Sequence, residues 1–60
     1  MATYKESINE NGDLIQLVSS PWNARNFAIL NRTKNTYSYH NDITEYAEAF
    51  ELYKKAVKAN

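Results

Sequence analysis

Few residues of this sequence could carry catalytic chemistry. The 60 residues include one histidine, His40, and no cysteine. No motif places a serine or a carboxylate around His40 as nucleophilic catalysis requires. This imidazole could act as a general base or a pH switch, but we favour a surface histidine at the end of a strand. The one glycine lies in a predicted turn, which leaves no glycine-rich loop for a phosphate. We therefore predict no catalytic residue, no cofactor and no enzymatic activity.

Three carboxylates recur at helical spacing in the last third of the chain. Asp42, Glu45 and Glu48 are three residues apart, so one face of a helix could present them to a hard cation. The same residues fit a helix cap followed by a solvated acidic first turn, where carboxylates face the positive end of the helix dipole. We predict the cap and no metal site.

The charges balance in number, seven basic against seven acidic, but they are unevenly distributed. Residues 14–41 contain three cations, Arg25, Arg32 and Lys34, and no acid. Four aromatic residues share this segment: Trp22, Phe27, Tyr37 and Tyr39. Cations between aromatics suit a phosphate track with stacking platforms, which makes Arg25, Arg32 and Lys34 candidate nucleic-acid contacts. Three cations are few for that task. The alternative is that the tyrosines pack under a helix while the cations solvate turns.

Trp22 is the only tryptophan, and it falls in the connection 20–23 between two predicted hairpins. A tryptophan there can plug the end of a small core, since tryptophan is on average highly buried. It can also be an exposed anchor, because Trp, Tyr and Arg dominate interface hot spots. The second interpretation predicts a partner-binding surface of four residues: Trp22, Arg25, Tyr37 and Tyr39.

The pair Asn11-Gly12 is the strongest local signal, because it supplies the two positive φ angles of a type I′ hairpin turn. A two-residue loop predicts strands at about 3–9 and 14–19, with Ile8 opposite Ile15. One face then carries Tyr4, Ile8, Ile15 and Leu17, and the other carries Lys5, Ser7, Leu14, Gln16 and Val18. A partner strand could add at an edge of the sheet, and so could a second copy of the chain. Because Leu14 and Val18 need a cover on that second face, we predict a homodimer through an edge strand.

A second hairpin and a helix complete the predicted order. Pro21 ends the second strand because it has no N–H for a ladder. Strands follow at about 26–31 and 36–40, around a polar turn in which Asn35 tolerates a left-handed backbone. Asp42 and Glu45 resemble a capping box at the start of a helix over about 43–58. Its apolar stripe comprises Ile43, Tyr46, Ala47, Phe50, Tyr53 and Val57. We predict one α+β domain, 1–60, of order ββββα: two antiparallel hairpins in a four-stranded sheet, with the helix packed on one face.

This architecture resembles one group of DNA-binding domains. The stretch from Trp22 through 27–30 and 36–39 to the helix 43–57 is similar to the arm-type amino-terminal domains of phage and transposon integrases, and to plant AP2 domains. Those domains place three antiparallel strands before a C-terminal helix. The resemblance rests on topology and spacing, and it implies a sheet that lies in the major groove of DNA.

Composition narrows the remaining function classes. No run approaches the roughly 20 apolar residues of a membrane span, and the first residues lack the apolar core of a signal peptide. We therefore expect a cytoplasmic protein that makes no membrane contact. Eight asparagines, five tyrosines and the short chain resemble small phage and mobile-element proteins, which often block a host enzyme or a defence complex. We predict a macromolecule-binding module of that type, a protein-interaction or inhibitor protein whose partner is a host or complex protein. The alternative is a sheet-face nucleic-acid-binding domain.

Overall fold

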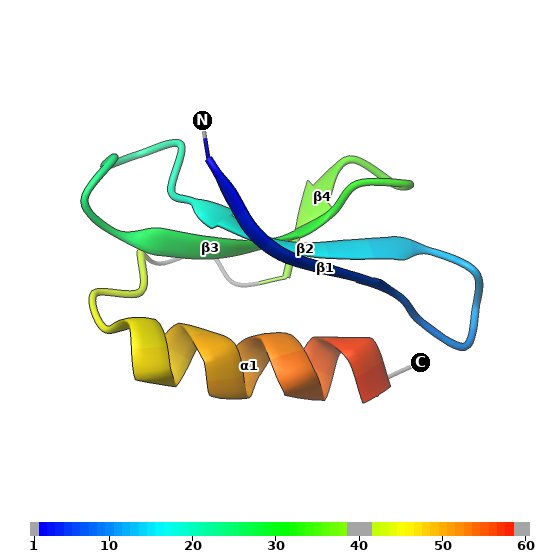
Figure 1. Ribbon diagram of the computed structural model, residues 1–60. Coiled ribbons are helices and arrows are strands. Elements are labelled where there is room, and N and C mark those ends of the chain that lie inside the picture. Colours follow the sequence, from blue (N-terminus) through cyan, green and yellow to red (C-terminus); the bar gives the residue numbers. More distant parts are fainter. Residues whose placement is uncertain (1, 39–41, 59–60) are drawn as a thin grey trace.

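The fold is a four-stranded antiparallel sheet with one helix on one of its faces (Figure 1). The computed structural model describes residues 2–38 and 42–58. Its elements are β1 (Thr3–Ile8), β2 (Leu14–Ser19), β3 (Phe27–Asn31), β4 (Thr36–Tyr37) and α1 (Tyr46–Lys58). The strands lie in sequence order, so the two hairpins share one sheet, and the predicted α+β, ββββα architecture is confirmed. No helix in the described ranges has the length and apolar character needed to cross a membrane.

β2 and β3 lie in the middle of the sheet and bury side chains on both of its faces. The core on the helix side comprises Ile15, Leu17, Ile29, Ile43, Ala49 and Tyr53. A second cluster, on the face away from the helix, comprises Val18, Ala28 and Leu30, with Tyr37 packed against it. The accessible surface of 4014 Å² matches the value of about 4,000 Å² expected for a monomeric protein of this mass. The chain therefore reaches ordinary compactness through its own contacts.

The loop of the first hairpin is longer than the sequence predicts. The Asn9 N–H donates to the Asp13 carbonyl at 2.9 Å, which leaves three residues in the loop. Gly12 has a φ of 84°, and Asn11 is not left-handed, so the turn is a type I turn followed by a left-handed glycine. The Asn9 side chain stabilises this form, because its Oδ1 accepts from the N–H groups of Asn11 and Asp13 at 2.9 Å each.

The extra loop residue shifts the pairing of β1 by one position. Ile8 lies opposite Leu14 and Ser7 lies opposite Ile15, so the predicted Ile8–Ile15 pair is wrong. A shift of one residue turns each side chain of a strand to the other face of the sheet. Ile8 is accordingly 62% exposed on the face away from the helix, while Lys5 and Ser7 face the helix. The predicted division of β2 between the two faces is confirmed.

Val18 does not need a second copy of the chain as cover. It is 1% exposed, in contact with the cluster on the face away from the helix. Leu14 is half-buried opposite Ile8. The homodimer through an edge strand remains a prediction, but one of the two residues that motivated it is covered within the chain.

The second hairpin follows the prediction where the structure describes it. Asn35 has a φ of 57°, so its predicted left-handed backbone is confirmed. β4 pairs with β3 through two residues, with Tyr37 opposite Leu30. Residues 39 and 40 of the predicted strand lie outside the described residues.

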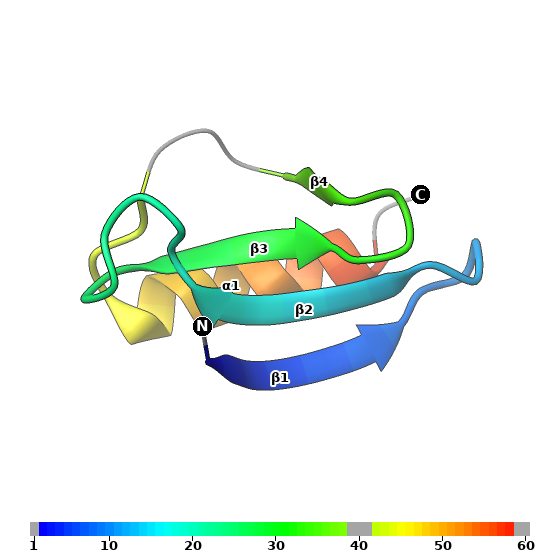
Figure 2. The same cartoon turned by 90° about the horizontal axis from the view of Figure 1, so that it is seen from above.

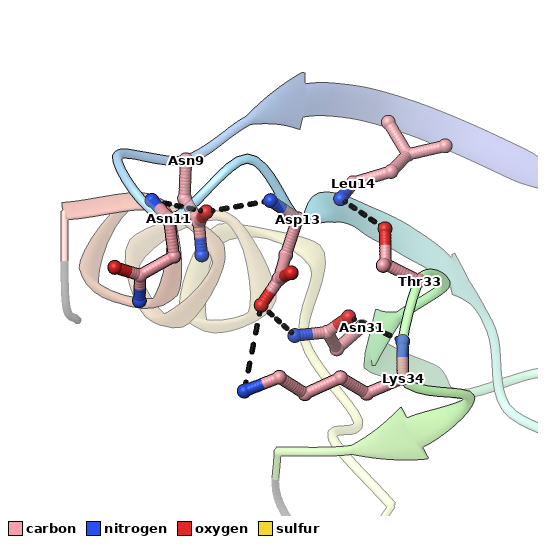
Figure 3. A network of polar contacts seen from close by, with 7 residues as sticks. All are labelled: Asn9, Asn11, Asp13, Leu14, Asn31, Thr33 and Lys34. Atoms are coloured by element: carbon pink, nitrogen blue, oxygen red, sulfur yellow. Dashed lines mark hydrogen bonds and ion pairs between the residues drawn. The ribbon is translucent and has the colours of Figure 1, made fainter.

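Polar contacts tie the two hairpin turns together at one end of the sheet (Figure 3). Asp13 Oδ2 accepts from Asn31 Nδ2 at 3.1 Å and lies 3.6 Å from Lys34 Nζ. Thr33 Oγ1 accepts from the Leu14 N–H at 2.8 Å. These contacts fix one turn against the other and satisfy the buried Asp13 carboxylate.

The helix begins later than predicted, and Asp42 does not cap it. Ile43 pairs with Phe27 as an isolated β-bridge, through hydrogen bonds of 2.8 and 3.1 Å in the two directions. This pairing holds the backbone of Ile43 extended, so the first residue of α1 is Tyr46. The carbonyl of Glu45 accepts the first helical bond, from the Ala49 N–H at 3.0 Å. The predicted stripe also needs correction, because its member Ala47 is exposed.

Candidate functional site

The face away from the helix carries a pair of aromatic side chains in contact, Trp22 and Tyr37, which we call the aromatic patch. The two ring centroids are 5.2 Å apart, with planes inclined at 57°. Tyr37 is half-buried against the cluster of Val18, Ala28 and Leu30. Trp22 is 56% exposed, so it does not plug the core. The predicted packing of the tyrosines under the helix is wrong for Tyr37, which lies on the opposite face.

Hydrogen bonds hold the connection that carries Trp22. The Ser20 hydroxyl donates to Asp42 Oδ1 at 2.5 Å and accepts from the N–H groups of Trp22 at 3.0 Å and Asn23 at 3.3 Å. Asn26 Nδ2 donates to the second oxygen of the same carboxylate, Asp42 Oδ2, at 3.1 Å. The loop between β2 and β3 is thus bonded to the segment that precedes α1. Trp22 is exposed on a loop of fixed conformation.

The structure brings together some of the predicted partner-binding residues. Trp22 and Tyr37 are in contact. Arg25 is exposed three residues after Trp22 in the same loop, where its N–H donates to Asn23 Oδ1 at 3.0 Å. Tyr39 lies outside the described residues, as does His40.

The predicted nucleic-acid contacts are not brought together. Arg25 precedes β3, while Arg32 and Lys34 follow it in the turn to β4. The five residues of β3, at about 3.3 Å each, separate the two groups by roughly 15 Å. Lys34 is also paired with Asp13 at 3.6 Å. The three cations therefore form no continuous basic track.

A second group of aromatic rings lies on the helix side of the sheet, and the sequence analysis assigned four of its five members to the core face of the first hairpin or to the apolar stripe of the helix. This aromatic row comprises Tyr4, Phe27, Tyr46, Phe50 and Tyr53, with neighbouring centroids 5.4 to 6.3 Å apart. Tyr4 is 44% exposed and Tyr46 is 41% exposed. An irregularity in the register between Thr3 and Lys5 keeps Tyr4 on the helix side. The spacing of Tyr46, Phe50 and Tyr53 on one helix face was the sequence signal for this row.

The acidic residues do not assemble into a metal site. No group of three potential metal ligands occurs in residues 2–38 and 42–58. Asp42 is bonded to Ser20 and Asn26 before the helix, away from the acidic turn that the sequence predicts. On the helix itself, a hydrogen bond from Lys54 and the charge of Lys54 lower the pKa of the Glu51 carboxyl. That pair is exposed and stabilises the helix surface only weakly.

No protein-family model matches the chain, and no similar curated protein or solved structure was found. The assignment of a function therefore rests on the geometry of the chain itself.

Proposed function

We propose that the chain is a protein-binding module whose contact surface is centred on the aromatic patch of Trp22 and Tyr37. The observation that carries the proposal is the exposure of Trp22 on a hydrogen-bonded loop. Tryptophan and tyrosine are among the residue types that most often anchor a protein interface. The fixed loop reduces the conformational entropy lost on binding.

The proposed surface includes Arg25 as a rim cation, because Arg25 follows Trp22 by three residues in the same loop. Its side chain is exposed on the Trp22 loop, where it can pair with a carboxylate of the partner. The role of inhibitor, a partner from a host or a larger complex, and a cytoplasmic location belong to the same proposal. We do not extend it to nucleic acid, because the cations that would contact phosphate lie at opposite ends of β3.

Affinity capture from a lysate, with and without nuclease, tests this proposal when it is combined with variants. Trp22→Ala and Tyr37→Ala should each abolish recovery of the partner protein while circular dichroism shows a folded chain. Tyr46→Ala is the matched control, because Tyr46 is exposed on the helix side. Nuclease-resistant recovery that depends on Trp22 but not on Tyr46 supports the proposal. Recovery of nucleic acid alone, or of a protein that binds all variants equally, contradicts it.

A further inference from the structure

β1 is the long free edge of the sheet. The strand order gives it one neighbour, β2, and the opposite edge strand, β4, has only two residues (Figure 2). The helix packs on β2 and β3, and Figure 2 shows β1 on the outer side of β2. An edge strand leaves a row of outward N–H and C=O groups without ladder partners in its sheet. The six residues of β1 are long enough to pair with an added strand.

The helix-side surface along β1 is formed by the aromatic row. β1 and α1 run in the same direction, and Tyr4 contacts Tyr46 at a centroid distance of 6.2 Å. Two helical turns after Tyr46, the Tyr53 hydroxyl shares a hydrogen bond of 2.6 Å with Ser7 of β1. A strand added outside β1 would place alternate side chains beside these half-exposed rings. An apolar side chain fits there, because it would cover the exposed parts of Tyr4 and Tyr46.

The same surface carries a cation. Lys5 Nζ lies 5.8 Å from the centroid of the Phe50 ring, on the side of the free edge. Lys54 Nζ lies 4.9 Å from the same ring, but Glu51 neutralises it at 2.9 Å. Within the described ranges, no carboxylate lies at ion-pair distance from Lys5. The charge on the helix side of β1 is therefore positive at Lys5, while Glu6 accepts a hydrogen bond from Gln16. An acidic side chain of the added strand beside Lys5 would complement this charge.

This charge disfavours a second copy of the chain as the added strand in the two registers that pair the most residues of β1. In a two-fold antiparallel pair of β1 strands, the central residue faces its own copy. Registers centred on Lys5 or Glu6 therefore place like charges opposite each other, which is destabilising. A strand from another protein, with an acidic residue opposite Lys5, avoids this repulsion.

We propose that the free edge of β1 binds an extended peptide segment of another protein by strand addition. The segment carries an acidic side chain beside Lys5 and apolar side chains at the flanking helix-side positions, over the aromatic row. Backbone hydrogen bonds to β1 supply the affinity, and the alternate side chains supply the selectivity. This surface is separate from the aromatic patch, so it goes beyond the function proposed above.

The test uses the intact chain, labelled with ¹⁵N, and a capped seven-residue peptide. The peptide has threonine at odd positions, glutamate at the centre, and valine at the two other even positions. Addition of this peptide should shift the amide signals of β1 more than those of the loop around Trp22. The control peptides have lysine at the centre, or N-methyl groups on alternate amides so that one edge cannot donate. Both controls should bind more weakly.

Lys5→Gln should weaken binding of the glutamate peptide by about two- to fivefold, the range for an exposed charge pair. Lys58→Gln is the matched control, since Lys58 is an exposed lysine at the last residue of α1. This substitution should leave the affinity unchanged. Unmoved β1 amides at millimolar peptide would overturn strand addition, as would equal binding of the N-methylated peptide. Equal affinity for the lysine peptide, or for the Lys5→Gln variant, would overturn the acidic selectivity. A dimer of the free chain with β1 amides protected would show that a second copy occupies the edge.

Discussion

Replacing Asp42 with alanine distinguishes a helix cap from a tie between two segments. As a cap, Asp42 would contribute about 1 kcal/mol to stability. In the structure its carboxylate accepts from Ser20 at 2.5 Å and from Asn26 at 3.1 Å. Hydrogen bonds to a charged group contribute about 1.5–3 kcal/mol each. Because Asp42 is only half-buried, we use the lower end, which gives a loss of about 3 kcal/mol for two bonds.

A loss of that size is large for this chain. A core formed by about 60 residues rarely supplies more than roughly 3–5 kcal/mol in total. Asp42→Ala should therefore lie close to its unfolding midpoint in water. Asp42→Asn keeps a neutral acceptor and should lose less. Urea unfolding followed by far-ultraviolet circular dichroism measures both free energies.

A double-mutant cycle with Ser20→Ala decides between the two roles. If the carboxylate acts through Ser20, the two substitutions remove the same bond, and their combined cost should fall short of the sum by about 1 kcal/mol or more. If Asp42 acted as a helix cap, it would share no bond with Ser20, and the costs of the two substitutions should add. The tie would be refuted by an Asp42→Ala cost near 1 kcal/mol that adds fully to the cost of Ser20→Ala.

Four further predictions concern the core, the register of β1, the first turn and the helix surface. Leu17→Ala should cost about 2–5 kcal/mol in urea unfolding, because Leu17 is fully buried. Ile8→Thr should change stability by less than about 0.5 kcal/mol, and a core-sized loss would support the register predicted from the sequence instead. Gly12→Ala should lower the free energy of unfolding by about 1 kcal/mol, because the φ of 84° is left-handed and unfavourable for alanine. A steric clash adds nothing to this cost, since a Cβ at this position would meet no other atom within 4 Å. The hydrogen bond from Lys54 lowers the pKa of Glu51 in the folded chain. The contribution of this pair to stability is therefore fully present above the ordinary pKa of 4.5, and it is lost as the pH falls through the lower pKa of the folded state. Glu51→Gln should therefore flatten the fall of the melting temperature in acid, and an unchanged slope would contradict the pairing.

Periodic patterns allowed correct prediction of the elements that pack against each other. The two predicted hairpins matched the four strands and their order, and the stripe through Phe50 and Tyr53 predicted the side of the helix that packs on the sheet. Asn35 was predicted as left-handed from its side chain alone. These features depend on residues close in sequence, which is why a single sequence contains the signal.

The errors arose where a short motif competes with contacts distant in sequence. Asn11-Gly12 favours a two-residue loop, but the two hydrogen bonds accepted by the Asn9 side chain stabilise a loop of three. Asp42 and Glu45 have capping-box spacing, but the bridge between Phe27 and Ile43 keeps that backbone extended. Trp22 and Tyr37 were predicted to share a binding surface from their residue types. The conformation of the loop that exposes Trp22 depends on a hydrogen bond from Ser20 to the carboxylate of Asp42, 22 residues away.

The distribution of burial explains how so short a chain can expose two aromatic surfaces and still fold. β2 and β3 supply most of the buried residues, and they are covered on both faces. Trp22 and the edge strand β1 lie outside this central pair, and their largest side chains are about half exposed or more. Truncation of those side chains removes little buried area, so binding can change without loss of the fold. The aromatic patch lies on the face away from the helix and the aromatic row lies on the helix side. Because the sheet separates the two surfaces, a partner on one of them leaves the other accessible.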